Sequence, residues 1–99
     1  MKIEIQAPWK VNDKLRGIIH TKVEKFTTYI DSIIRTDVFL KVNEKDSPND
    51  KIAEIRVSLP GPYIFAESTA DTHEKAVASA AEKIRKQLLK KKEKLQDKS

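Results

Sequence analysis

The last third of the chain carries a continuous apolar stripe at helical spacing. Steps of three and four residues place its members on one side of an α-helix. The stripe consists of Val77, Ala80, Ala81, Ile84, Leu88 and Leu95. Asp71-Thr72-His73-Glu74 has the spacing of a capping box, so we expect Asp71 to cap this helix and Glu74 to occupy its third position. A helix of roughly 25 residues must then bury one face against the rest of a small chain.

A second amphipathic helix is predicted nearer the start. Asn12 is a suitable N-cap, and Asp13 falls in the first turn, where the helix dipole favours an acid. Apolar residues then recur at three- and four-residue steps to about Tyr29. They are Leu15, Ile18, Ile19, Val23, Phe26 and Ile30.

Four segments have the alternating pattern of half-buried strands. They are residues 2–6, 38–42, 53–59 and 63–69. In each, apolar and polar side chains alternate with period two, which places the apolar ones on a single face. The run Pro60-Gly61-Pro62 predicts a tight reversal between the last two strands.

The predicted order is therefore β-α-β-β-β-α. Four one-sided strands and two one-sided helices bury one another as an α+β two-layer sandwich, a four-stranded sheet with both helices on one face. We expect one domain over residues 1–95 and a frayed tail over 96–99.

Several functional classes find no support in the residues. The chain has no cysteine, which excludes a disulfide framework and a thiolate zinc site. His20 and His73 lie on different predicted helices without carboxylates at ligand spacing, so we expect no metal and no other cofactor. No nucleophile constellation or phosphate-cradling glycine loop is present, so we expect neither an enzyme nor a small-molecule substrate. With no signal peptide or long apolar run, we expect a cytoplasmic protein that has no membrane partner.

Positive charge is concentrated in the predicted second helix. Seven basic residues and one acid lie between Lys83 and Lys94, a local net charge of +6 in a chain whose total is +5. Lys83, Lys86, Lys90 and Lys94 share one helical face, flanked by Gln87 and Lys91. Lys22 and Lys25 lie three residues apart on the first helix, with Arg16 about two turns earlier. Such a surface suits a polyphosphate backbone, but a solvated lysine face near a helix C-terminus would have the same composition.

The aromatic residues offer a competing site. Phe39 and Phe65 have the parity of the outer sheet face, where RNA-recognition motifs stack bases. The strand order and the missing glycine-aromatic signature argue against that fold, so we expect the two rings to cover each other as a cross-strand pair. Trp9 is expected to be a packing anchor between the first strand and the first helix.

The pattern of the second helix also resembles a known family. The most specific stretch runs from Ala70-Asp71 through Ala76-Val77 and Ala80, then through residues 83–88 to Lys90 and Lys94. Residues 3–5, 15–16, 22–26 and 59–61 add supporting matches. Together they resemble the family of ribosome hibernation-promoting factors and ribosome-associated inhibitors, also called the sigma-54 modulation family, over nearly the whole chain.

This resemblance implies a fold similar to double-stranded-RNA-binding domains and a role on the small ribosomal subunit. Members of the family lie in the channel used by mRNA and tRNA, against 16S rRNA, and they keep idle 30S subunits and 70S ribosomes inactive in stationary phase or under stress. The rRNA-binding candidates carried over by position are Arg16, Lys22, Lys25, Lys83, Lys86, Lys90 and Lys94, and this sequence adds Arg85 and Lys91. The chain resembles the short form, which we expect to be a monomer when free.

The sequence departs from the family pattern at three positions. Glu74 replaces a tyrosine, Ala78 a polar or acidic residue, and Thr28 a frequent lysine. Two alternatives stay open. One is a generic double-stranded-RNA-binding module, although residues 43–50 lack the histidine of such modules and the lysines lie late in the helix. The other is a protein–protein adaptor that docks through the second helix.

Overall fold

The elements follow one another in the predicted order. The structure, a computed structural model, describes residues 1–43 and 48–96, with side chains through Lys94. The elements are β1 (Lys2–Gln6), α1 (Asp13–Glu24), a 3-10 turn η1 (Lys25–Thr28), β2 (Arg35–Val42), β3 (Lys51–Ser58), β4 (Ile64–Ala70) and α2 (His73–Gln96). Residues 43 and 48–50 contain no helix or strand, and residues 97–99 of the predicted tail lie outside the described residues.

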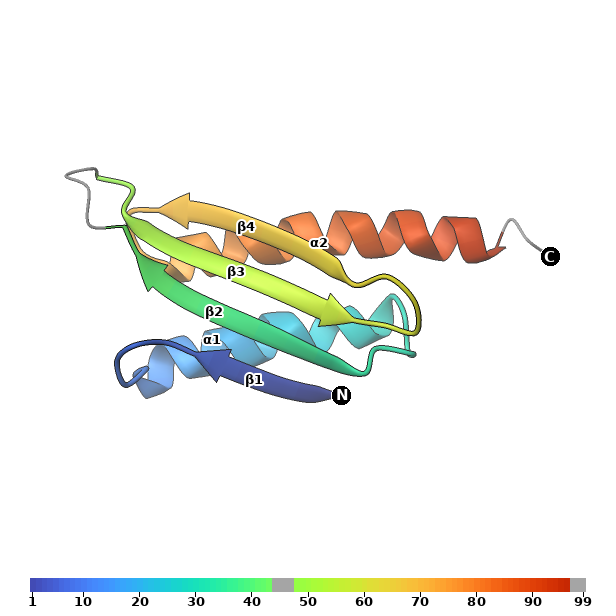
Figure 1. Cartoon of the computed structure of the whole chain (residues 1–99), viewed down its shortest axis with the longest axis horizontal. Helices are drawn as coiled ribbons and strands as arrows, with labels where there is room; N and C mark the ends of the chain where they lie inside the picture. The colour runs from blue at the N-terminus through green and yellow to red at the C-terminus, as the bar shows by residue number, and fades with distance from the viewer. Residues whose placement is uncertain (44–47, 97–99) are drawn as a thin grey trace.

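The four strands form one mixed sheet in the order β1-β2-β3-β4. β1 pairs with β2 in parallel, and the two later pairings are antiparallel. Both helices cover the same face of this sheet, and the other face is open (Figure 1). The α+β two-layer sandwich is therefore confirmed.

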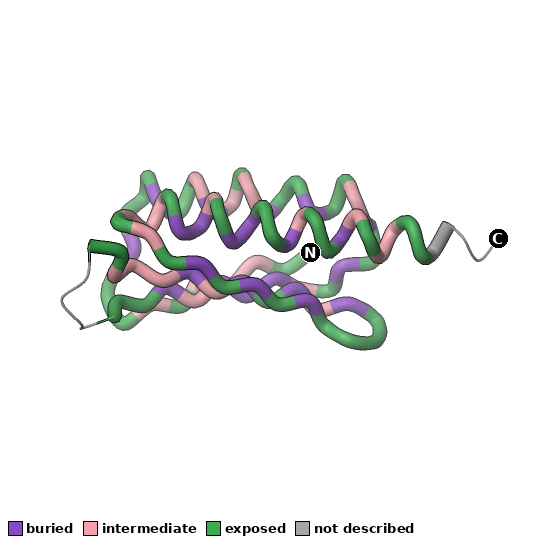
Figure 2. The backbone as a smooth tube through the Cα atoms, turned by 90° about the horizontal axis from the view of Figure 1, so that it is seen from above, coloured by how far each residue is buried: buried purple, intermediate pink, exposed green. Residues whose placement is uncertain are grey.

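The core lies between the sheet and the helices, as the alternating patterns predict. Buried residues occur on the sides of the helices that face the sheet and along the strands (Figure 2). The largest aliphatic ones that are fully buried are Ile19, Val23, Val38, Leu40, Ile55, Val57, Val77, Ile84 and Leu88. Together they form one contiguous cluster with Phe26, which fixes both helices on the sheet.

β2 begins three residues earlier than its apolar pattern predicts. Pairing with both neighbouring strands begins at Arg35 and includes the polar residues Thr36 and Asp37, whose burial an apolar alternation cannot reveal. Asp37, only 1% exposed, accepts two hydrogen bonds from Arg35 at 2.7 and 3.1 Å, and its other partner is Arg56 at 3.5 Å. Val42, expected to face the core, is exposed at the far end of the strand.

The cap of α2 is shifted by one residue from the prediction. The side-chain oxygen of Thr72 accepts a hydrogen bond from the backbone N–H of Lys75 at 3.2 Å, and the Thr72 carbonyl accepts one from Ala76. Thr72 is therefore the N-cap, and the predicted capping box of Asp71 and Glu74 is wrong. Asp71 instead forms an ion pair with Lys75 at 3.2 Å. Thr72 directly precedes α2, and its hydroxyl reaches the N–H of Lys75, the third residue of the helix. Asp71 lies one residue further back and does not cap that N–H.

Two predictions about aromatic residues are also corrected. β3 lies between β2 and β4, so Phe39 and Phe65 are not a cross-strand pair: Phe39 is opposite Glu54, and Phe65 is opposite Arg56. Trp9 is 37% exposed rather than a buried anchor. Its ring packs on the imidazole of His73, with the ring centroids 5.1 Å apart.

α2 extends beyond the sheet that it covers. Its 24 residues span roughly 36 Å, whereas the seven residues of β4 span roughly 23 Å. Figure 1 shows the C-terminal turns of α2 continuing past the β3–β4 turn. The last buried side chain among those described on α2 is Leu88, so residues 89–94 form an overhang that the sheet does not support.

Candidate nucleic-acid interface

A narrow groove between the two helices collects basic side chains from both. Its volume is about 190 Å³. One side of the groove is formed by Lys22 of α1, by Lys25 and Phe26 of η1, and by Tyr29 just after it. The other side is formed by α2, through Ala78, Ala81, Glu82 and Arg85. The two alanines keep the floor open, and the cationic groups stand along its rim. Residues from distant parts of the chain thus meet here because both helices pack on one sheet face.

Glu82 is the acid within this basic groove. Its carboxylate accepts hydrogen bonds from Arg85, including one from Nε at 3.0 Å. Hydrogen bonding to Arg85 holds the pKa of Glu82 below its ordinary value, and the nearby charges of Arg85, Lys86 and Lys22 act in the same direction. The same pairing raises the pKa of Arg85. Glu82 therefore stays ionised and partly neutralises the groove.

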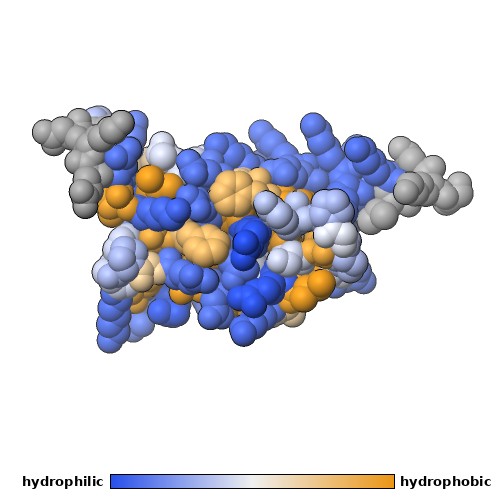
Figure 3. All heavy atoms as spheres, in the orientation of Figure 1, coloured by the Kyte–Doolittle hydropathy of each residue, from blue (hydrophilic) through white to orange (hydrophobic). Residues whose placement is uncertain are grey.

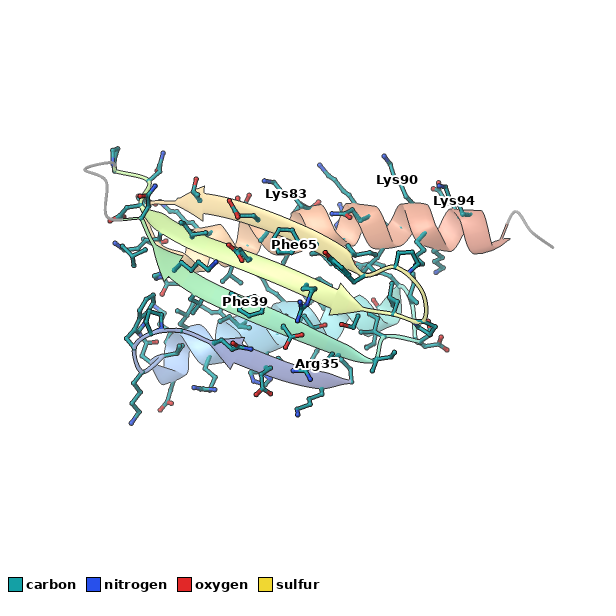
Figure 4. All side chains as sticks on the ribbon, in the orientation of Figure 1. Arg35, Phe39, Phe65, Lys83, Lys90 and Lys94 are labelled. Atoms are coloured by element: carbon teal, nitrogen blue, oxygen red, sulfur yellow. The ribbon has the colours of Figure 1, made fainter. Side chains whose placement is uncertain are left out.

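A second basic surface lies on the opposite side of α2, along the free edge of β4. Here α2 crosses the strand edge with two long side chains: Lys83 Nζ donates to the carbonyl of Glu67 at 2.8 Å, and Gln87 Nε2 donates to that of Phe65 at 3.0 Å. Four residues of helix rise about 6 Å and two residues of strand about 6.6 Å, so the two spacings match. Figure 4 shows Lys83, Lys90 and Lys94 extending from α2 along this edge.

Below the overhang of α2 the surface is hollowed. This overhang hollow has a volume of about 670 Å³ and is lined by Ile64, Gln87, Lys90, Lys91, Glu93 and Lys94. Three ammonium groups and one carboxylate thus surround a space that has one apolar wall. Such a hollow attracts an anionic group and can hold an apolar or planar one beside it.

The chain matches one protein family over residues 3–96, described as "Sigma 54 modulation protein / S30EA ribosomal protein". It belongs to this family. A search of curated protein sequences finds no match.

Solved structures of other proteins support the assignment to the Sigma 54 modulation family. A ribosomal subunit interface protein from Coxiella burnetii superposes with a TM-score of 0.82 at 26% identity, covering 93% of this chain and 98% of that one. The N-terminal domain of Protein Y from Thermus thermophilus superposes with a TM-score of 0.77 at 22% identity, covering 91% of this chain and 98% of that one, which shows a shared fold. Ribosome-associated proteins are therefore the relatives of this chain.

In this member of the Sigma 54 modulation family, the nine sequence-predicted residues divide into separate groups. Lys22, Lys25 and Arg85 line the groove, and Lys90, Lys91 and Lys94 line the overhang hollow. Lys83 is at the β4 edge, where its ammonium is bonded to Glu67. Lys86 is exposed on the outer surface of α2, close enough to Glu82 to affect its pKa.

Arg16 lies apart from these groups. Six residues separate Arg16 from Lys22, which turns their side chains about 120° from each other around α1. Arg16 is exposed and lines neither the groove nor the overhang hollow. The number of helical turns between two residues gives their separation along the axis but not the direction of their side chains.

Two residues near the site escaped the sequence argument. One is Glu82, an acid among the bases, whose spacing of three from Arg85 is typical of an ion pair on a helix. Lys92 lies beside residues 27–32 at the end of η1. It is seven residues from Arg85, which leaves the two side chains only about 20° apart around the helix, so a helical projection places Lys92 on the side that faces α1.

Other chemistries gain no support in the described part of the chain. Over residues 1–43 and 48–96 no three acidic or histidine side chains come together as metal ligands would. Neither helix of that part has the length and apolar content that a membrane crossing requires.

Proposed function

We propose that this protein is a ribosome-binding translation inhibitor, a hibernation factor that docks the basic surface of its helices on 16S rRNA. The site is the mRNA and tRNA channel of the small subunit, where the protein excludes both ligands and keeps idle ribosomes inactive. As proposed, it acts in the cytoplasm, as a monomer when free, without a cofactor and without catalysing a reaction.

The observation that carries this proposal is the convergence of basic residues from both helices in a chain of this family. Lys22 and Lys25 reach the same groove as Arg85, and the lysines of α2 continue outward from it to the overhang. A solvated lysine face needs no such convergence, because the helix dipole acts on each helix separately. Basic side chains on both sides of a groove instead suit the binding of a negatively charged polyphosphate backbone.

The expected binding depends strongly on salt. Each phosphate contact contributes about 0.7 to 0.9 to the slope of log affinity against log salt. Seven contacts would give a slope of about −5 to −6. An adaptor that docks on a protein would show a much weaker dependence.

Cosedimentation with 30S subunits across a salt series tests the proposal. The test variant reverses Lys22, Lys25 and Lys86 to Glu, because the first two line the groove and the third is exposed on the outer surface of α2. It keeps Lys83, whose ammonium is bonded to the Glu67 carbonyl. The control reverses Lys2, Lys10 and Lys75, three exposed lysines away from the groove and the overhang hollow. Both variants change the net charge by the same amount.

We expect saturable binding of one copy per 30S subunit, competition by mRNA or tRNA, loss in the test variant and retention in the control. Equal loss in both variants would mean that only net charge matters. Equal affinity for any RNA duplex would favour the generic double-stranded-RNA-binding module. Binding of the test variant at ordinary salt would overturn the assignment of the site.

A further inference from the structure

The open face of the sheet carries aromatic rings that the helical site does not use. Hydrophobic side chains interrupt the polar surface of this face (Figure 3). Phe65 on β4 is 42% exposed, and Tyr63, two residues earlier and of the same parity, is 63% exposed. Neither ring is needed for the core, which lies on the other side of the sheet.

The two phenylalanines of this face differ in how they are covered. The guanidinium of Arg56 lies over the ring of Phe39, 5.8 Å from its centroid, and Arg56 is held there by the buried Asp37 at 3.5 Å. Phe39 is half-buried, whereas Phe65, which lies opposite Arg56 on β4, is exposed. Phe65 is therefore the ring of this pair that can accept a ligand.

Phe65 adjoins the lysines of α2 through the strand edge. Its own carbonyl accepts the hydrogen bond from Gln87, and Gln87 also lines the overhang hollow beside Lys90, Lys91 and Lys94. Ile64, the neighbour of Phe65, forms the apolar wall of that hollow. The exposed ring of Phe65 is thus connected across the β4 edge to the three ammonium groups that line the overhang hollow. Figure 4 shows Phe65 on this strand, with Lys90 and Lys94 extending from α2 beyond it.

The arrangement of rings beside cations is the one that binds single-stranded nucleic acid. A basic track follows the phosphates, and aromatic rings stack the bases. A duplex cannot use the rings, because its bases are already stacked inside the helix. The carbonyls of Phe65 and Glu67 are already bonded to side chains of α2, which disfavours the addition of a peptide strand at this edge.

We propose that the β4 edge binds an unpaired RNA segment, with its bases on Phe65 and Tyr63 and its phosphates on Lys90, Lys91 and Lys94. The proposal deepens the proposed function and rests on it, because it adds single-stranded contacts to a surface for structured rRNA. It assigns the overhang of α2 a role distinct from that of the groove between the helices.

Fluorescence anisotropy with a labelled oligouridylate of about 12 nucleotides tests this assignment against an RNA duplex of the same length. The test variant is Phe65→Leu, which keeps an apolar side chain but removes the ring. The matched control is Phe39→Leu, the same change on the same face at the ring that Arg56 covers. Thermal melting of both variants checks that they remain folded.

We expect Phe65→Leu to weaken single-strand binding about fivefold or more and to leave duplex binding within about twofold. Phe39→Leu should bind both ligands as the wild type does. Equal single-strand affinity in Phe65→Leu and the wild type would overturn the proposal, as would a wild type that does not bind the single strand. Cosedimentation of Phe65→Leu with 30S subunits, run in parallel, shows separately whether the proposed function holds.

Photo-crosslinking with 4-thiouridine oligonucleotides provides a readout that does not depend on affinity. We expect adducts on the peptide that contains Tyr63 and Phe65. Adducts confined to α1 and the outer surface of α2 would overturn the proposal. Capture of a protein on the same edge, lost in Phe65→Leu while RNA binding is unchanged, would assign these rings to a protein partner instead.

Discussion

The carboxylate of Glu82 is paired with the guanidinium of Arg85, so one groove arginine is already bonded before any ligand arrives. Nε of Arg85 lies 3.0 Å from a carboxylate oxygen of Glu82, and a second guanidinium nitrogen bonds to the other oxygen. A phosphate that binds Arg85 must compete with this carboxylate. We therefore expect the pair to lower the affinity of the groove for polyanions.

Glu82→Gln is expected to tighten binding to ribosomes or RNA at low salt. Arg85 then becomes available as one more phosphate contact, which should steepen the log–log salt slope by about 0.7 to 0.9. The measurement is the binding titration at several salt concentrations. Glu24→Gln, which makes the same charge change at an exposed site outside the groove, is the control. An unchanged slope in Glu82→Gln would show that Arg85 does not contact phosphate.

The same pair predicts a pH effect on stability. Because the pKa of Glu82 in the folded protein lies below its unfolded value, near 4.3, the ionised carboxylate stabilises the fold above that pH. This contribution is lost as pH falls through the lowered folded pKa. The stability difference between wild type and Glu82→Gln should therefore be largest near neutral pH and shrink as the pH falls below about 4.3, measured by urea unfolding. A difference that is constant over this range would contradict the pairing.

Asp37→Asn should destabilise the sheet by about 1.5 to 3 kcal/mol, the range for hydrogen bonds to charged groups. The buried carboxylate joins Arg35 and Arg56 across β2 and β3, and an amide cannot serve both cations. Glu4→Gln, a more exposed acid at the position opposite Asp37, is the control and should have a small effect. Equal losses in chemical denaturation would show that burial of Asp37 contributes little.

Thr72→Ala should cost about 1 kcal/mol, because it removes the hydroxyl that caps the Lys75 N–H. Asp71→Ala removes an exposed ion pair with Lys75 and should cost only about 0.3 to 0.5 kcal/mol. Urea unfolding of the two variants distinguishes the cap in the structure from the one that the sequence predicts. A larger loss in Asp71→Ala would restore the predicted capping box.

Ile84→Ala should lower stability by about 2 to 5 kcal/mol, since its side chain is fully buried against the sheet. Leu89→Ala, a similar truncation at a half-buried position on the same helix, should cost clearly less. Chemical denaturation gives both values. A melting temperature unchanged by Ile84→Ala would mean that the buried face of α2 is wrongly assigned.

The fold was predictable because its core side chains follow regular periods. In the strands, buried residues alternate with outward-facing ones, as at Val38 and Leu40 and at Ile55 and Val57. In α2, the buried residues Ile84 and Leu88 are one helical turn apart. These spacings predict strands and helices that each bury one face. The start of β2 was missed because it is built on Asp37, whose burial depends on two arginines that only the folded sheet brings together. The false pairing of Phe39 with Phe65 arose from parity alone, which gives the face of a strand but not its neighbour.

The basic residues of the site were visible in the sequence, but their grouping was not. In the sequence, Lys83 and Lys90 look equivalent, since both are basic residues on the same face of α2. In the structure, Lys83 is hydrogen-bonded to the edge of β4, whereas Lys90 lines the overhang hollow. That difference depends on where the sheet ends under the helix. The sequence of α2 alone contains no information on it.

In the overhang of α2, surface charge can change independently of the stability of the fold, although the two are usually linked in a small domain. Lys90 and Lys94 are exposed on this overhang, so replacing them changes surface charge without disturbing the core. Mutation can therefore adjust how firmly the protein is held and how easily salt or a competitor removes it, while the melting temperature stays the same. The overhang therefore allows binding affinity to change during evolution with little effect on folding.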